Sequence, residues 1–457
     1  MKLTAINPAN GEVVRETEAD NDGAIENKLA AAQQAFSDWR ETSFAERAAV
    51  LKKIAADMRD RVEELAPLMT EEMGKPIREA RAEVEKAAWC AEHYAEHAES
   101  YLAPQTLPSD ATHSYVQHLP IGAVMGVLPW NAPFWLAFRF CAPALMAGNT
   151  CLMKHDPHVP GCAEAIADLF VRNNAPEGVF QALLLETERV ERVLRDDRIK
   201  AVSFTGSSRG GAAVASIAAS EIKPAVLELG GSDPSIVLAD ADLEKAAEIL
   251  KVSRIINAGQ SCIAAKRLIV EAPVYDQMLA LLTEKFTALK GGDPALDDTD
   301  VGPIAREDLR NELHRQVQAT VDNGARLVMG GELPGAPGYF YPVTLLADVE
   351  PGMCAFEEET FGPIGVVIRA DDADHALRLA NDTEYGLAAS VWSTPERGEA
   401  LARELEAGQV AVNGIVKTDP RLPSGGIKKS GYGRELGPHG IHEFVNAQQV
   451  WVGPARG

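Results

Sequence analysis

The sequence predicts an α/β protein built from two parallel-sheet domains, and three observations support this fold class. The chain has 457 residues, two to three times the usual size of one domain. Between residue 121 and about 270, short apolar runs alternate with helical stretches, a pattern typical of a mainly parallel sheet covered on both faces. A second alternating series follows to about residue 415. We therefore place the boundary between the two domains near residues 227–234, LELGGSDP.

The individual elements follow from the spacing of apolar residues. From Ala48 to about Ser100 they recur every three or four positions, which predicts helices broken near Pro67 and at Gly74-Lys75-Pro76. Further helices are expected over 275–289 and 306–323, and a long loop over 417–440. The expected strands are IGAVMGVL, NTCLMK, VFQALLL, AVSFTG, AVLELGG, SIVLAD, RLIVE, IGVVIRA and GQVAVNG.

Composition excludes several classes of partner. The formal charge of −23 opposes non-specific binding to nucleic acid or to an anionic membrane. Six cysteines without a CxxC pair predict reduced thiols, and the N-terminus lacks the apolar run of a secretory signal, so we expect a cytoplasmic protein. The uncharged segment 119–138 is long enough to cross a membrane, but Pro120, Pro129 and Pro133 would interrupt such a helix.

Three residues are candidates for chemistry. Cys262 lies in NAGQSCI, where small and polar neighbours favour access to the thiol. Glu228 lies among apolar residues at a strand end, where desolvation would raise its pKa and suit a general base, although a satisfied buried acid would look the same. Asn131, between Pro129 and Pro133, offers an amide donor that could stabilise an alkoxide, although it could also be only a turn residue.

Other patterns leave alternatives open. Gly206 and Ser207 lie where a strand passes into a helix, and backbone N–H groups there could face a phosphate, although both GK[ST] and GxGxxG are missing. His93, Glu96 and His97 match the H-x-x-E-H pattern of a zinc protease, for which we favour a structural role and expect no metal. A cofactor-independent thiol hydrolase would use the same cysteine and glutamate.

Taken together, these segments resemble the aldehyde dehydrogenase superfamily, in order and over nearly the whole chain. The forms around Lys154 and Arg139 and the ending GGIKKSGYGREL look most like its short-chain succinate-semialdehyde dehydrogenases. The motifs that carry the resemblance are Pro-Trp-Asn at 129–131, Lys154, Phe-Thr-Gly-Ser at 204–207, Leu-Glu-Leu-Gly-Gly at 227–231, Gly-Gln-Ser-Cys at 259–262 and Glu-Glu-Thr-Phe-Gly-Pro at 358–363.

The resemblance implies a covalent mechanism and a dinucleotide cofactor. Cys262 would attack the aldehyde, Asn131 would hold the oxyanion, and Glu228 would activate the water that hydrolyses the thioester. Lys154 and Glu359 would hold the two riboses, and Phe361 would pack at the nicotinamide end. The implied cofactor residues are Trp130, Lys154, Pro157, Gly206, Ser207, Leu229, Glu359 and Phe361.

Substrate choice can be argued from helix geometry. If a helix starts near Pro133, the Arg139 guanidinium points back toward Asn131 and could pair with the carboxylate of a short ω-carboxylated aldehyde such as succinic semialdehyde. A surface or interdomain ion pair is an equally good interpretation of Arg139. Glutaric semialdehyde is an alternative substrate. The remaining implied substrate residues are Trp135, Ser261 and Thr418.

Two departures from the common family pattern leave questions open. Ser232-Asp233 follows Gly230-Gly231 where many relatives carry lysine, and its consequence is not predictable. Pro157 stands where NAD-preferring relatives often have glutamate; we favour NAD over NADP, although Arg209 could favour NADP.

The resemblance also implies a division of the chain. It predicts an NAD(P)-binding domain over 1–100 and 119–229, a catalytic domain over 230–428, and a small β arm over 101–118 and 439–457 that joins a homodimer or homotetramer.

Overall fold

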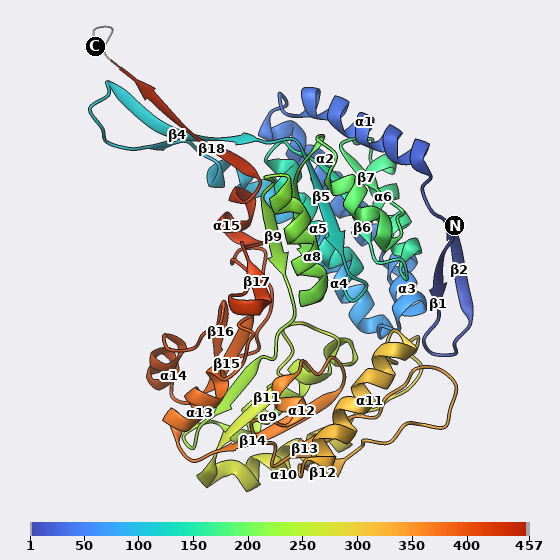
Figure 1. Ribbon diagram of the computed structural model, residues 1–457, viewed down its shortest axis with the longest axis vertical. Coiled ribbons are helices and arrows are strands. Elements are labelled where there is room, and N and C mark those ends of the chain that lie inside the picture. Colours follow the sequence, from blue (N-terminus) through green and yellow to red (C-terminus); the bar gives the residue numbers. More distant parts are fainter. Residues whose placement is uncertain (1, 454–457) are drawn as a thin grey trace.

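The computed structural model describes residues 2–453, and two large sheets dominate it (Figure 1). One has six strands in the order β17-β9-β8-β5-β6-β7, and the other has seven in the order β12-β13-β14-β11-β10-β15-β16. All neighbouring strands are parallel except two edge pairs, β17 with β9 and β12 with β13. The predicted α/β class with two mainly parallel sheets is therefore confirmed.

The six-stranded sheet is covered on both faces, which explains its uninterrupted apolar runs. In its central strand, Val124 and Leu128 pack with α2–α6, whereas Met125 and Val127 pack with α1, α7 and α8. Its strands are β5 (Ala123–Leu128), β6 (Thr150–His155), β7 (Phe180–Ala182), β8 (Ile199–Thr205), β9 (Ala225–Glu228) and β17 (Gly431–Tyr432). The helices are α1 (Asp22–Trp39), α2 (Phe44–Asp60), α3 (Val62–Met73), α4 (Ile77–Tyr101), α5 (Pro133–Met146), α6 (Pro160–Arg172), η1 (Thr187–Arg189), α7 (Val190–Leu194) and α8 (Ser208–Ser220).

One predicted helix break is wrong and the other is confirmed. Pro67 lies inside α3, and the chain breaks earlier, at Arg61 between α2 and α3. The buried face of α3, including Leu65 and Met69, packs into the core, and this burial outweighs the backbone hydrogen bond that proline cannot donate. Gly74 ends α3 in the left-handed conformation, with φ of 78°, as a C-terminal glycine cap.

The seven-stranded sheet begins where the chain crosses from β9 to β10, inside the predicted boundary at 227–234. The helices expected over 275–289 and 306–323 are α10 and α11, each slightly shorter than predicted. The strands are β10 (Pro234–Val237), β11 (Arg267–Glu271), β12 (Arg326–Met329), β13 (Thr344–Ala347), β14 (Ile364–Ala370), β15 (Ala388–Trp392) and β16 (Gln409–Val412). The helices are α9 (Leu243–Ile255), η2 (Ile256–Gly259), η3 (Ala272–Val274), α10 (Tyr275–Thr287), α11 (Glu307–Asp322), α12 (Cys354–Glu357), α13 (Ala373–Asn381) and α14 (Pro395–Ala402).

A three-stranded arm projects from the body of the molecule (Figure 1). In it β18 (Val445–Val452) pairs antiparallel with the whole of β4 (His113–Pro120), and β4 also pairs with β3 (Gln105–Thr106). The end of the predicted arm, residues 454–457, lies outside the described residues. A separate hairpin near the N-terminus consists of β1 (Lys2–Ile6) and β2 (Val13–Glu18).

The segment 417–440 is only partly the loop that the sequence predicts. It contains η4 (Lys428–Ser430), β17, and the start of α15 (Gly437–His442). Gly431 pairs with Glu228 of β9, at a φ of 111°, and a Cβ there would lie 2.0 Å from the Leu227 carbonyl oxygen. This segment is therefore ordered by pairing with β9, a strand far away in the sequence, and local composition cannot predict such a pairing.

The uncharged segment tested for membrane insertion forms the end of β4, then β5, then the start of α5. Within residues 2–453, no helix combines the length and the apolar character needed to cross a membrane.

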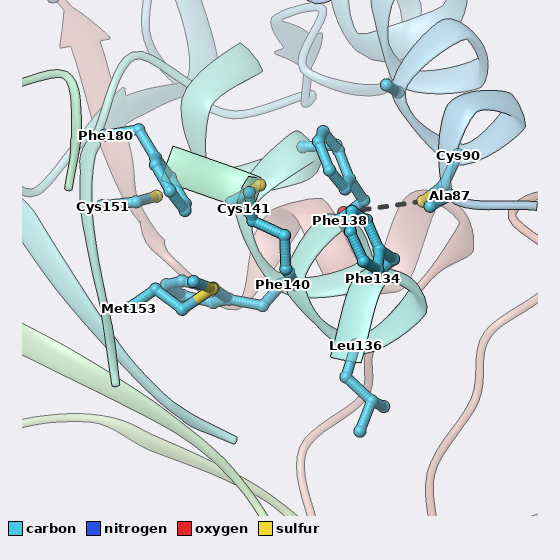
Figure 2. Close-up of a cluster of buried hydrophobic side chains, with 14 of the residues drawn as sticks. Ala87, Cys90, Phe134, Leu136, Phe138, Phe140, Cys141, Cys151, Met153 and Phe180 are labelled. Carbon is cyan, nitrogen blue, oxygen red and sulfur yellow. Dashed lines mark hydrogen bonds between the residues drawn. The ribbon is translucent and has the colours of Figure 1, made fainter. Parts of the chain in front are cut away.

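Helix α5 is the centre of the largest apolar core, and every one of its residues is buried (Figure 2). Its aromatic side chains pack between the sheet and helix α4, and the Cys90 thiol donates to the Phe138 carbonyl. Phe140 covers Gly126 of β5 so closely that a Cβ there would lie 2.6 Å from the ring.

We expect Phe140→Ala to lower the free energy of unfolding by about 3–5 kcal/mol, because it leaves a cavity against β5. Denaturant unfolding measures the change. Val171→Ala is the control, because this α6 side chain is 74% exposed and its loss should cost less than about 0.5 kcal/mol. A similar loss of stability in both variants would contradict the packing described here.

Candidate active site

A pocket of about 260 Å³ is lined by residues from four parts of the chain, within 75–86, 131–139, 253–263 and 415–418. Helix α4 contributes Glu83 and Lys86, and the end of η2 leads into the segment that carries Cys262. The predicted residues that line the pocket are Asn131, Trp135, Arg139, Ser261, Cys262 and Thr418. Six residues that span positions 131 to 418 of the sequence therefore share one cavity.

An unusual backbone turn brings Cys262 to the pocket. Asn257, Ala258 and Gly259 all adopt left-handed φ angles, of 54°, 52° and 76°. At Gly259 no side chain fits, because a Cβ would lie 2.1 Å from the Gly362 carbonyl oxygen. Such strain is retained only where the surrounding structure holds it, and here it is next to the candidate nucleophile.

The half-buried Cys262 thiol is protonated at neutral pH. Burial raises its pKa to about 11, and the charges of Arg139 and Lys266 work in the opposite direction. Two cations therefore already favour the thiolate, although they do not outweigh desolvation.

Asn131 lies beside the cysteine segment, immediately before α5. Its side-chain Nδ2 donates to the Gln260 carbonyl at 3.1 Å, and an amide nitrogen carries a second hydrogen that can be donated elsewhere. Its backbone carbonyl accepts hydrogen bonds from Lys75 and Asn257, both at 2.9 Å. These contacts hold the amide at the edge of the pocket.

Glu228 lies at the end of β9 and is 2% exposed. Burial raises its pKa to about 7, and Arg139 limits the rise. Arg139 Nη2 lies 3.7 Å from Glu228 Oε2, and Arg139 Nε pairs closely with Glu435. Arg139 does form ion pairs, as the alternative interpretation held, but these pairs are buried and not on the surface, and the same side chain lines the pocket.

Five of the eight predicted cofactor residues lie at or just after the ends of β6, β8 and β9. Lys154 is the next-to-last residue of β6 and Gly206-Ser207 follow β8, so they lie at the same carboxyl edge of the sheet, where α/β proteins bind ligands. Ser207 caps α8 by accepting from Gly210 N–H at 3.2 Å. Leu229 packs against Gly211 of α8, Pro157 is half-buried beyond β6, and the rings of Trp130 and Phe361 meet edge to face at 6.0 Å.

These residues fit an anionic dinucleotide. The first N–H groups of the 13-residue helix α8 favour a negative charge. The Lys154 side chain is almost fully buried, and in the described residues its ammonium makes no hydrogen bond. A buried cation and a helix N-terminus at the same edge of the sheet offer the charges that a phosphate-linked ligand needs.

Sequence reasoning missed Lys266, which links the two halves of the site. This side chain is 1% exposed, donates to the Cys262 carbonyl at 2.6 Å and pairs with Glu359 at 2.9 Å. It also faces buried Asp233, whose pKa burial raises to about 7 and Lys266 lowers. The departure at Ser232-Asp233 therefore places a carboxylate near this lysine. The sequence offered one sign of this role, because Lys266 lies directly before the apolar strand β11, where a lysine is unusual.

The H-x-x-E-H pattern lies on α4. His93 shares a hydrogen bond with the Tyr101 hydroxyl at 3.1 Å, and its ring lies 4.6 Å from that of His97. No group of three or more His, Cys, Asp or Glu side chains in residues 2–453 is arranged to hold a metal ion.

Exposure of the six free thiols predicts a labelling pattern. We expect iodoacetamide to modify Cys262 and Cys354 in the native protein and to spare the four buried cysteines, namely Cys90, Cys141, Cys151 and Cys162. Because burial raises the pKa of Cys262 to about 11, its rate should keep rising with pH beyond 9. Peptide mapping by mass spectrometry, with Cys354→Ser as the control, measures both; a rate that levels off near pH 8 would contradict this electrostatic account.

Comparisons with known proteins agree with this arrangement. Residues 1–450 match the model of the aldehyde dehydrogenase family. The chain is 48% identical over 453 residues to a "Probable succinate-semialdehyde dehydrogenase [NADP(+)]" from Synechocystis, covering 99% of this chain and 100% of that protein. It is 45% identical to the Escherichia coli "Succinate semialdehyde dehydrogenase [NAD(P)+] Sad", covering 98% of this chain and 97% of that one.

A solved structure shows the same fold. The succinic semialdehyde dehydrogenase from Streptococcus pyogenes, in complex with NADP+, superposes with a TM-score of 0.97 at 34% identity, covering 99% of this chain and 100% of that one. The sequence match, the shared fold and the pocket around Cys262 lead to one assignment. The chain belongs to the aldehyde dehydrogenase family.

Proposed function

We propose that this protein oxidises succinic semialdehyde to succinate, with NADP or NAD as the hydride acceptor. The observation that carries the proposal is the shared pocket, in which Cys262 and Asn131 lie together with several cations. The names of the similar proteins from Synechocystis and Escherichia coli support the same substrate.

Cys262 is the proposed nucleophile. Its thiol proton passes to solvent water, the sulfur attacks the aldehyde carbon, a C–S bond forms, and the carbonyl electron pair moves to oxygen. The second hydrogen of Asn131 Nδ2 and the Cys262 backbone N–H stabilise this oxyanion. Trp135 and Ser261 form the nearby walls of the pocket.

The nicotinamide cofactor supplies an acceptor for the hydride that leaves the substrate carbon, so that a thioester remains on Cys262. Lys154, Gly206 and Ser207 are proposed to bind its ribose and phosphates, with Trp130, Pro157 and Leu229 as walls. Glu359 would receive the second ribose, and it is already oriented by Lys266 and by the Gly231 N–H at 3.2 Å. Phe361 would pack at the nicotinamide end.

Glu228 is the proposed base for thioester hydrolysis. A carboxylate with a pKa near 7 is an effective proton acceptor at neutral pH, and its Oε1 is buried without a hydrogen-bond partner in the described residues. It takes a proton from water as the water oxygen attacks the thioester; the C–S bond then breaks and the acid leaves.

The proposed oxidation can use either NAD or NADP. The similar proteins are named for NADP(+) or NAD(P)+, whereas the sequence favours NAD. Initial rates with each cofactor over a panel of short aldehydes, including glutaric semialdehyde, decide between them. The thiol hydrolase alternative predicts no change in nicotinamide absorbance at 340 nm.

We also propose a cytoplasmic homo-oligomer, a dimer or a tetramer. The free thiols suit a reducing compartment, and the projecting strand pair of β4 and β18 has exposed Trp451 and Val452 available for contact with a second copy. In this proposal residues 1–100 and 119–229 bind the cofactor, 230–428 carry the nucleophile, and 101–118 with 439–457 join the subunits.

The two covalent steps can be separated by mutation. Cys262→Ala should abolish reduction of the cofactor, because no thioester can form. Glu228→Gln should retain a first-turnover burst of up to one hydride per site and lose at least 100-fold in steady-state turnover. Stopped-flow absorbance at 340 nm measures both phases, and steady turnover near the wild-type rate in either variant would refute the assignment.

Turnover should also depend on pH through Glu228. Because its pKa is raised to about 7, the carboxyl is protonated and inactive as a base below that pH, so steady turnover should rise as pH increases from 6 to 8. The burst should persist across this range. If turnover limited by hydrolysis shows no ascending limb near 7, the base is another group.

A further inference from the structure

Lys86, on α4, extends its ammonium into the pocket beside two buried side chains. Its Nζ donates to Thr418 Oγ1 at 2.7 Å and lies 4.1 Å from the centre of the Trp135 ring. All three residues line the pocket that contains Cys262. The ammonium is thus held by a hydroxyl and an aromatic face, and in residues 2–453 it forms no ion pair with a carboxylate.

Two of the neighbouring cations differ from Lys86 in this respect. Lys75 pairs closely with Glu83, and Arg139 is paired with both Glu228 and Glu435. Burial and, to a smaller extent, the positive charge of Arg139 together lower the pKa of Lys86 to about 8. The surroundings therefore disfavour this ammonium until an anion enters the pocket.

The position of Lys86 suits the far end of a short substrate. The charge of Arg139 lowers the pKa of both Cys262 and Lys86, so the guanidinium is near both groups, and all three residues line the same pocket. Thr418 accepts from Lys86 through oxygen, which leaves its own hydrogen available for donation. An entering carboxylate can therefore receive one hydrogen bond from each side chain.

We propose that Lys86, together with the Thr418 hydroxyl, binds the distal carboxylate of an ω-carboxylated aldehyde and so determines preference for that substrate class. This inference rests on the proposed aldehyde oxidation. Arg139 is already paired with two protein carboxylates, so it contributes mainly through the electrostatic attraction of its positive charge for the substrate. Trp135 holds the lysine in place by the cation–π contact.

The test compares two aldehydes of four carbons, succinic semialdehyde and butanal, with each cofactor. We expect Lys86→Met to lower kcat/KM for succinic semialdehyde by about 10- to 100-fold, mainly through KM, because a charge-assisted hydrogen bond is lost. The value for butanal should change by less than about threefold. Lys52→Met removes an equal charge from exposed α2 and should leave the ratio of the two values unchanged.

Two further variants keep the inference testable if Lys86→Met folds poorly. Thr418→Val should lower the same ratio by about three- to tenfold, since one hydrogen bond is lost and the charge remains. Lys86→Arg should retain most of the preference for the carboxylated aldehyde. Arg139 variants are less informative here, because they also leave Glu228 and Glu435 without their cation.

The pH dependence supplies an independent measurement. The charged groups that face Lys86 are Glu83 on its own helix, Arg139 on α5 and Asp419 in the following loop, with the Cys90 thiol also near. KM for succinic semialdehyde should rise above pH 8 as Lys86 loses its proton, while KM for butanal does not. In Lys86→Arg this rise should move to higher pH, because a guanidinium stays charged.

The outcomes distinguish a failure of the role proposed for Lys86 from a failure of the proposed aldehyde oxidation. Equal losses for both aldehydes in Lys86→Met would make the lysine structural, and an unchanged ratio would place the carboxylate elsewhere; either result overturns the inference. If the wild-type protein reduces neither cofactor with any aldehyde, the proposed function itself is wrong.

Discussion

The complete burial of helix α5 is the constraint on which the site depends. Because this helix packs between the six-stranded sheet and α4, the turn that leads into it holds the Asn131 amide beside the cysteine segment, and its middle carries Arg139 into the interior. A buried guanidinium needs carboxylates, and Glu228 from β9 and Glu435 from the C-terminal segment provide them. Apolar packing and the position of the proposed base are therefore coupled.

The charge of the whole chain and the charge of the pocket have opposite consequences. A net charge of −23 repels the anionic ligands of the proposed reaction, a dinucleotide and a carboxylated aldehyde. Local cations oppose this repulsion. Lys86 and Arg139 line the pocket, Lys154 is one of the proposed cofactor residues, and Lys266 donates to the Cys262 carbonyl. Most of these cations have carboxylate neighbours, so the electrostatic field is shaped locally.

Much of the fold and of the candidate site could be predicted from the sequence, because each motif is local. The βα alternation predicted both sheets, and the proline-flanked turn predicted where α5 begins. The failures have long-range causes. Pro67 remains helical because core packing outweighs its missing hydrogen bond, and the end of the 417–440 segment is ordered because Gly431 pairs with Glu228. In both cases the stabilising contacts come from the tertiary structure and not from the local sequence.

The sequence by itself determined the family resemblance, the set of candidate groups and the acidic character of the chain, since these depend on residue types and their order. Only the tertiary structure decided which of those groups meet. It paired Arg139 with two carboxylates, placed Lys266 between Cys262 and Glu359, and left Lys86 in the pocket with a hydroxyl and a ring. The physical reason is that pKa values, ion pairs and pocket walls depend on distance and burial, and neither quantity is encoded locally.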